Sequence, residues 1–379
     1  MSGPFPALTL TPEGFAALLA ELRRQGYALL GPSVVQGDFG HREISGAADL
    51  PRGLGMEQEA GTFRLVFRGD AELFGYPVGQ HSWKPVFFPS SRLMWEATRT
   101  AGGWEIALPS EDLPPVALIG VRPCDLAALG VLDRIFLKGP YVEPYYQARR
   151  EAAFVVAVNC TRPGGTCFCA SMGTGPRAQG GFDLALTEMF THEGHWFLVE
   201  MGTAAGRRLM EKVPHREATR GEAEAAAQAL AAAAGRMGRQ LTVAGLQEHL
   251  YENYEHRHWA EVAARCLTCG NCAMVCPTCF CHHLEDSINL RGDQASRRRV
   301  QDVCFTVAHS YIHGGSVRAT PRARYRQWLT HKLATWQDQF SCLGCVGCGR
   351  CITWCPVGID LTAEVAALRR PETPPAKRE

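Results

Sequence analysis

Hydrophobic and polar positions follow different patterns in the two halves of the chain. Near the start, apolar residues recur at helical spacing between Thr11, which can cap a helix, and Gly26, which can end it. The predicted buried face of this helix is Phe15, Leu18, Leu19 and Leu22. Residues 62–68 instead alternate, which predicts a half-buried strand with Phe63, Leu65 and Phe67 facing inward.

Two short runs farther along, residues 116–121 and 154–158, are wholly apolar. Such runs are typical of strands in a parallel sheet that is covered on both faces. A helical pattern over residues 126–137 follows the first run. The first half is therefore predicted to be an α+β domain with buried parallel strands.

The second half has few strand-like runs. Residues 204–238 are rich in Ala, Glu and Arg and predict a helix or a helical linker. Residues 296–336 are Arg-rich and mostly helical in propensity, and Arg297–Arg299 are expected on a solvated helix face. We predict three segments: a mixed α/β domain (1–204), a helical linker (205–240) and a mostly α-helical domain (241–379).

Composition narrows the class of protein. Hydrophobic residues make up 46% and charged residues 20%, which argues against extensive disorder. Lys and Arg number 39 against 38 Asp and Glu, so charge gives no reason to expect a nucleic acid or a membrane as partner. No secretory leader and no run of 18 apolar residues is present, so a cytoplasmic location is expected. In that reducing compartment, sixteen cysteines indicate metal or redox chemistry more than disulfides.

Two cysteine runs carry the strongest motif. Each has the spacing C-x2-C-x2-C-x3-C-P of bacterial ferredoxins, where three thiolates hold one [4Fe–4S] cluster and the fourth holds the other. The first run is Cys266, Cys269, Cys272 and Cys276, and the second is Cys345, Cys348, Cys351 and Cys355. We therefore expect one cluster on Cys266, Cys269, Cys272 and Cys355, and a second on Cys345, Cys348, Cys351 and Cys276.

Structural zinc is the alternative for these runs, but the third cysteine in each run is surplus to a zinc site. The runs are separated by 68 residues, Pro277 to Gly344, and small ferredoxins have shorter connections. The long insertion favours a mostly α-helical, ferredoxin-like two-cluster domain over residues 241–379, whose helices keep water away from the two clusters.

Four cysteines in the first half form a candidate third site. Cys124 and Cys160 follow the two predicted parallel strands, at the sheet edge where open α/β folds place their sites. Cys167 and Cys169 lie in a Gly-rich loop whose backbone can approach a ligand closely. We predict that these four thiolates bind a third iron–sulfur cluster, the alternative being ordinary buried cysteines.

Four cysteines remain without an assigned role. Cys342 lies three residues before Cys345, so a ligand set that begins at Cys342 is an alternative for the second run. The Cys-Pro spacing favours Cys345 as the first ligand. Cys279 and Cys281 either pack beside a cluster or provide an alternate ligand. Cys304 is expected to be a buried structural thiol.

The sequence resembles the iron–sulfur beta subunit of cytoplasmic sulfhydrogenases, which are NAD(P)-linked nickel–iron hydrogenases. It is also similar to the A subunit of anaerobic sulfite reductase. The resemblance covers about residues 25–365 and rests on four segments: VRPCDLAALGVLDRIFL, NCTRPGGTCFCASMGTGP, CLTCGNCAMVCPTCFC and GCVGCGRCITWCPVGIDLT. Cys342 departs from the usual pattern of the family, so no family role carries over to it.

The resemblance implies electron transfer within a complex. Its partners would be a flavin- and NAD(P)-binding subunit and nickel–iron hydrogenase subunits, or a sirohaem subunit if the complex is a sulfite reductase. No nickel–iron ligand set and no nucleophile–base pair is visible, so no substrate site is expected in this chain. Other hypotheses are a zinc-stapled interaction protein and a self-sufficient reductase that uses the N-terminal cysteines.

Overall fold

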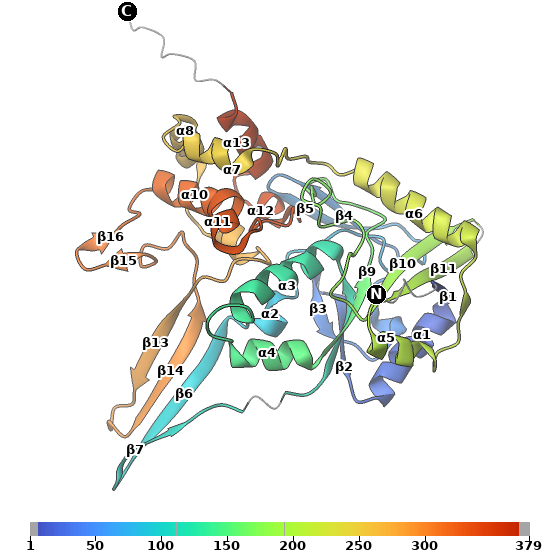
Figure 1. Cartoon of the computed structure of the whole chain (residues 1–379), viewed down its shortest axis with the longest axis horizontal. Helices are drawn as coiled ribbons and strands as arrows, with labels where there is room; N and C mark the ends of the chain where they lie inside the picture. The colour runs from blue at the N-terminus through green and yellow to red at the C-terminus, as the bar shows by residue number, and fades with distance from the viewer. Residues whose placement is uncertain (1–6, 111–112, 193, 371–379) are drawn as a thin grey trace, which may run out of the picture.

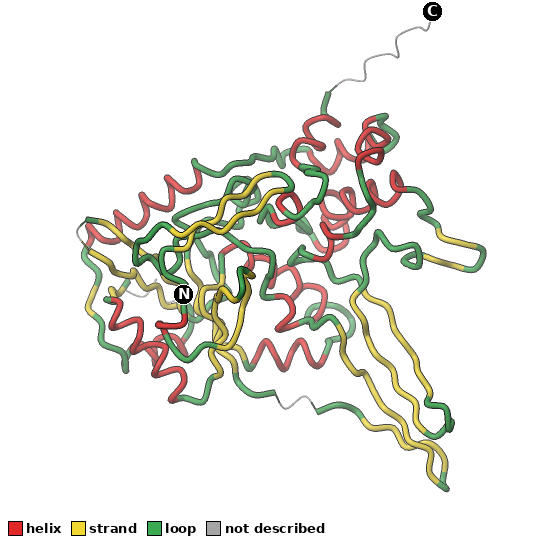
Figure 2. Tube along the Cα trace, turned by 180° about the vertical axis from the view of Figure 1, so that it is seen from behind, coloured by secondary structure: helices red, strands yellow, loops and turns green. Residues whose placement is uncertain are grey.

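The computed structural model describes residues 7–110, 113–192 and 194–370, so the outermost residues of the predicted N- and C-terminal domains lie outside it. A large sheet with helices on both faces forms one side of the molecule (Figure 1). The C-terminal helices form the other side, and a narrow β arm projects away from both (Figure 2).

The large sheet has eight strands in the order β12-β1-β11-β10-β9-β8-β2-β3. Its four central strands, β10, β9, β8 and β2, are parallel, and the outer pairs are antiparallel. The strands are β1 (Leu8–Leu10), β2 (Ala28–Val35), β3 (Asp38–Glu43), β8 (Val116–Val121), β9 (Ala153–Val158), β10 (Leu184–Thr191), β11 (Gly194–Met201) and β12 (Arg216–Glu217). The prediction of buried parallel strands is confirmed.

Helices cover both faces of this sheet, which explains the wholly apolar strands. Ile119 and Val156 pack in the same core as Phe15 of α1 (Pro12–Arg24), which lies beside α5 (Ala204–Met210). Leu118 and Val155 face the opposite core with α3 (Pro123–Phe136). The other helices on that side are α2 (Lys84–Phe87) and α4 (Pro144–Glu151). The Thr11 side chain caps α1 as predicted.

A hairpin made of β4 (Leu54–Glu59) and β5 (Thr62–Phe67) follows the short helix η1 (Ala47–Asp49). The strand prediction for β5 is confirmed. The prediction that Phe67 faces inward is wrong, because this residue is 64% exposed. The hairpin packs against the core of the large sheet through Leu54 and Leu65. It also packs against the second cysteine motif, where the Phe63 ring centroid lies 4.9 Å from that of Trp354.

The predicted linker contains α6 (Arg220–Gly235), which begins with a capping box between Thr219 and Glu222. This helix packs on the large sheet, with Ala226 buried against Met189 and Leu198. The predicted segment boundaries remain a prediction.

Short helices dominate the C-terminal region. They are α7 (Leu246–Glu252), α8 (His258–Arg265), α9 (Asn271–Met274), α10 (Pro321–Thr330), η2 (His331–Thr335), α11 (Trp336–Phe340), α12 (Arg350–Thr353) and α13 (Leu361–Leu368). Their apolar faces share one core, built around Trp259, Trp328 and Leu333. No helix in the described ranges is long and apolar enough to cross a bilayer.

The arm corrects part of the helical prediction. Its sheet has the order β13-β14-β6-β7, with β6 (Ser91–Thr100), β7 (Gly103–Ala107), β13 (His282–Ile288) and β14 (Gln294–Gln301). Residues 296–301 are therefore a strand and not a helix, because β14 is hydrogen bonded on both sides and this pairing overrides helical propensity. Arg299 is buried over the Phe88 ring instead of lying on a solvated helix face. A small hairpin, β15 (Tyr311–Ile312) with β16 (Gly315–Ser316), follows.

Candidate metal centres

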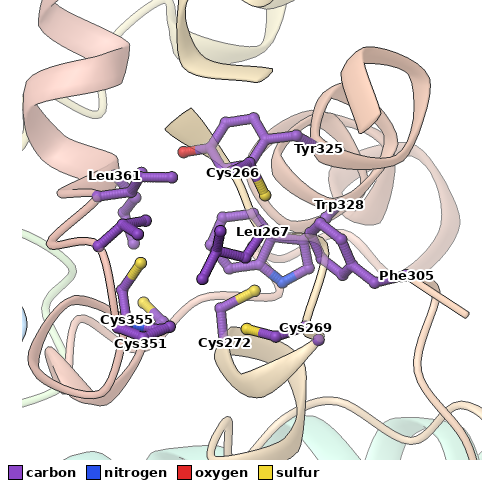
Figure 3. A pocket seen from close by; sticks show the side chains of 14 residues that line it. Cys266, Leu267, Cys269, Cys272, Phe305, Tyr325, Trp328, Cys351, Cys355 and Leu361 are labelled. Atoms are coloured by element: carbon purple, nitrogen blue, oxygen red, sulfur yellow. The ribbon is translucent and has the colours of Figure 1, made fainter. Parts of the chain in front are cut away.

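Cysteines from both motifs line one pocket. The first motif contributes Cys266, Cys269 and Cys272, while Cys351 and Cys355 come from the second (Figure 3). The rest of the lining is mostly apolar and includes Phe305, Tyr325, Trp328 and Leu361. The structure therefore brings together the four thiols predicted for the first cluster, with Cys351 beside them.

Left-handed backbone lets each motif fold tightly around its thiols. Gly270 (φ +74°) precedes α9, and Gly349 (φ +78°) precedes α12. Backbone N–H groups donate to the sulfur atoms: Thr268 N lies 3.4 Å from Cys266 Sγ, and Gly347 N lies 3.5 Å from Cys345 Sγ. Such bonds stabilise negative charge on sulfur.

The second predicted set is also brought together. Cys276 is close enough to Cys345, Cys348 and Cys351 for its charge to act on the pKa of each. Burial raises the pKa of Cys345 to about 12 and also raises the pKa of Cys348 and Cys351. A hydrogen bond from Cys279 and the neighbouring Lys332 ammonium instead lower the pKa of Cys276.

Two buried lysines hold the loop that follows Cys276. Lys332 Nζ lies 2.9 Å from Cys276 Sγ, and Lys84 Nζ donates to the carbonyl oxygens of Cys276 (2.9 Å) and Cys279 (3.0 Å). Sequence reasoning missed both lysines, because neither is near a cysteine motif along the chain.

The third predicted set converges at the carboxyl ends of β8 and β9. Cys169 is close enough to act on the pKa of Cys124, and Cys160 is close enough to act on the pKa of Cys167 and Cys169. Burial raises the pKa of all four thiols, that of Cys167 to about 12. Met237, which sequence reasoning missed, lies with its Sδ 3.8 Å from Cys169 Sγ.

The second and third sets are neighbours. Cys167 Sγ lies 3.9 Å from the carbonyl oxygen of Cys348, and Phe168 N donates to Gly347 O at 2.9 Å. Asp125 and Arg350 form a fully buried ion pair at 2.7 Å between these two loops. This pair had no signal in the sequence, since its members are 225 residues apart.

Of the four cysteines without a predicted role, three are neighbours and Cys342 lies elsewhere. Cys279 lies near Cys276 and Lys332, while the side chains of Cys281 and Cys304 hydrogen bond with each other. Cys342 is half-buried and packs near Trp336, apart from them. In the part of the chain that the structure describes, no three His, Cys, Asp or Glu side chains are grouped so that they could hold a single metal ion.

An iron–sulfur cluster fits the first set in two respects. The donors are thiols, which are the ligands that iron–sulfur clusters take, and five of them line one pocket. In addition, the apolar lining and N–H···S bonds are suited to a buried thiolate-bound centre. The ligand role of each cysteine stays a prediction.

Comparison with known proteins defines the class. Residues 265–359 match the 4Fe-4S dicluster domain family, so the chain is an iron–sulfur protein with a domain for two [4Fe–4S] clusters. It is also 33% identical over 246 residues to sulfhydrogenase 2 subunit beta of Pyrococcus furiosus, which covers 64% of this chain and 71% of that relative. The chain therefore belongs to the sulfhydrogenase beta-subunit family. No solved structure matches it significantly.

Proposed function

We propose that the chain is the electron-transfer subunit of a cytoplasmic sulfhydrogenase complex. It would relay electrons between a flavin- and NAD(P)-binding subunit and a nickel–iron catalytic subunit. The observation that carries this proposal is the pocket in which three cysteines of one motif meet Cys355 of the other. The relative from Pyrococcus furiosus favours a hydrogenase complex over a sulfite reductase.

The proposed ligands follow the grouping of the thiols. Cys266, Cys269, Cys272 and Cys355 would hold one [4Fe–4S] cluster, and Cys345, Cys348, Cys351 and Cys276 the other. A bound [4Fe–4S] cluster supplies a centre that takes up and releases one electron. A reducing, cytoplasmic location suits a chain whose cysteines are proposed to act as thiolate ligands.

We further propose a third cluster on Cys124, Cys160, Cys167 and Cys169. The proposal is supported by four thiols at one sheet edge, three of them buried and Cys160 half-buried, directly beside the loop that carries Cys348. Thiols with raised pKa values stay protonated and neutral at pH 7 unless a metal binds them. The four thiols can therefore act as thiolates together only when a metal cluster compensates their charge.

The surrounding residues have definite tasks in this proposal. Phe305, Tyr325 and Trp328 exclude water from the first centre. Lys332 places a positive charge against Cys276, and backbone N–H groups donate to Cys266 and Cys345.

Iron and acid-labile sulfide analysis tests the cluster assignments. With three [4Fe–4S] clusters, the intact chain should contain about twelve iron atoms, and the double variant Cys124→Ser/Cys160→Ser should contain about eight. Cys342→Ser is the matched control and should keep the full iron content. An unchanged iron content in the double variant would remove the third site, and a colourless protein with bound zinc would remove the electron-transfer role.

Co-purification tests the complex. Affinity purification of the chain from its own organism under anaerobic conditions should bring down a nickel-containing subunit and a flavin-containing subunit. Recovery of a sirohaem subunit in their place would identify a sulfite reductase complex and contradict the proposal.

A further inference from the structure

Two of the cysteines outside the proposed ligand sets meet at the base of the arm. Cys281 directly precedes β13 and Asp302 directly follows β14, and Asp302 N donates to Cys281 O at 2.9 Å. Cys304 lies two residues beyond Asp302. The side chains of Cys281 and Cys304 hydrogen bond with each other, and both residues are half-buried. The hairpin pairing thus holds two thiols side by side.

A histidine and a carboxylate complete the group. His309 hydrogen bonds with the Cys281 side chain, and His309 Nδ1 lies 3.1 Å from Asp302 Oδ2. The other carboxylate oxygen of Asp302 accepts from Val303 N (2.8 Å) and Thr306 Oγ1 (2.9 Å). Asp302 is therefore fixed and orients the His309 ring, in the order cysteine, histidine and carboxylate that activates thiol nucleophiles.

The electrostatic surroundings favour a thiolate on one member of the pair. Hydrogen bonds from Cys304 and His309 lower the pKa of Cys281 to about 4, while the hydrogen bond with Cys281 and burial raise the pKa of Cys304. The same contact with Cys281 raises the pKa of His309. Cys281 is the member of the pair that contacts His309, so we assign it as the nucleophile and Cys304 as the resolving thiol.

We propose that Cys281 and Cys304 form a redox-active dithiol–disulfide pair that exchanges electrons with a low-molecular-weight disulfide. The Cys281 thiolate attacks one sulfur of the disulfide R–S–S–R, which forms a mixed disulfide and releases one thiolate. Cys304 then loses its proton and attacks the Cys281 sulfur. This forms the Cys281–Cys304 disulfide and releases the second thiolate. The pair has lost two electrons and the one proton of Cys304, and R–S–S–R has taken up both electrons and become two thiolates, one of which accepts that proton.

Reduction of the protein disulfide takes back two electrons and one proton, which restores the Cys281 thiolate and the Cys304 thiol. One-electron reductants of the iron–sulfur class would supply the electrons, and this return step alone rests on the proposed function. Cys304 is placed for it, since it packs against the same apolar core as Cys272 of the first proposed ligand set. The pair would then couple one-electron centres to two-electron thiol chemistry.

Redox equilibration of the intact, iron-loaded chain tests the pair. The protein is incubated anaerobically in buffers of reduced and oxidised dithiothreitol, quenched with N-ethylmaleimide and digested for mass spectrometry. We expect a disulfide-linked peptide that joins Cys281 to Cys304 and that converts to two alkylated peptides over a single two-electron transition. Absence of this link at every buffer ratio would overturn the proposal.

Variants separate the pair from a ligand role. Cys281→Ser and Cys304→Ser should each abolish the linked peptide and leave iron and sulfide content unchanged. The control Cys342→Ser should keep both the linked peptide and the full iron and sulfide content. His309→Gln should slow alkylation of Cys281 at pH 7 by about tenfold, because the thiolate loses its partner. Loss of iron or of bound zinc in Cys281→Ser or Cys304→Ser would assign these residues as metal ligands and overturn the proposal. A colourless chain that still forms the link would contradict only the proposed electron-transfer function.

Discussion

At the scale of single residues, the charges buried beside the cysteines have the largest consequences. Lys332 is buried, with its ammonium group 2.9 Å from Cys276 Sγ. The neighbouring cysteines raise the pKa of Lys332 well above its ordinary value although burial opposes this, so the lysine is charged at neutral pH. The reduced state of a cluster bound by Cys276 carries more negative charge than the oxidised state. A positive charge at Lys332 therefore stabilises the reduced state.

Replacing this charge should change a reduction potential. Lys332→Met is expected to make the potential of the centre on Cys276 more negative by on the order of 100 mV. A hydrogen bond to a charged group is worth about 1.5–3 kcal/mol, and about 59 mV corresponds to a tenfold change for one electron. A redox titration followed by electron paramagnetic resonance measures the shift. Lys332→Arg keeps the charge and should shift the potential less, and a shift to more positive values in Lys332→Met would contradict the argument.

At the scale of elements, two cysteine loops from different halves of the chain interlock. The loop with Cys167 and Cys169 packs against the turn that contains Gly347 and Gly349, where any side chain would collide with it. A Cβ on Gly347 would lie 2.7 Å from the Phe168 carbonyl, and one on Gly349 would lie 2.4 Å from Thr166 O. Both glycines also have positive φ values, +65° and +78°, so backbone conformation and close packing require the same residue.

Substitution at this contact should damage both loops together. Gly349→Ala is expected to cost roughly 1–3 kcal/mol from the left-handed backbone alone, with more from the collision. The free energy of unfolding and the iron content should both fall. Gly130→Ala in the middle of α3 is the control, because nothing lies within 4 Å of its Cβ and alanine favours a helix by about 0.5–1 kcal/mol. Full iron content in Gly349→Ala would show that the loops do not depend on this contact.

At the scale of the whole molecule, the α/β half and the helical half are joined through their cysteine sites. The ion pair of Asp125 with Arg350 is buried between them, with side chains 2% and 1% exposed. Asp125 follows Cys124 at the start of α3, and Arg350 lies between Cys348 and Cys351. The ion pair therefore ties the loop that carries Cys124, of the third predicted set, to the loop that carries Cys348 and Cys351, of the second.

Breaking this pair should destabilise the whole chain. Asp125→Ala leaves the Arg350 guanidinium buried without its partner, which is expected to cost about 3–5 kcal/mol. Denaturant unfolding of the iron-loaded protein measures this loss. Glu224→Gln removes an exposed pair with Arg220 and should change stability by less than about 1 kcal/mol. Equal effects of the two substitutions would contradict the role of the buried pair.

Patterns that depend on neighbouring residues were predictable from the sequence. The cap of α1, the two buried parallel strands and the two cysteine motifs of the dicluster domain each follow from local spacing. The error at residues 296–301 has the opposite origin. That segment has helical propensity, but it is a strand because its hairpin partner β13 pairs with one edge and β6, from a distant part of the chain, pairs with the other.

The sequence by itself determined which residues are chemically suited to bind iron–sulfur clusters, since thiol spacing sets which donors one short loop can present. The tertiary structure decided what surrounds those thiols. Lys332, the pair of Asp125 with Arg350, and the meeting of Cys281, Cys304 and His309 all join residues that are far apart along the chain or fixed by hairpin pairing. Burial and charge act through space, and only the folded chain brings these groups within reach of one another.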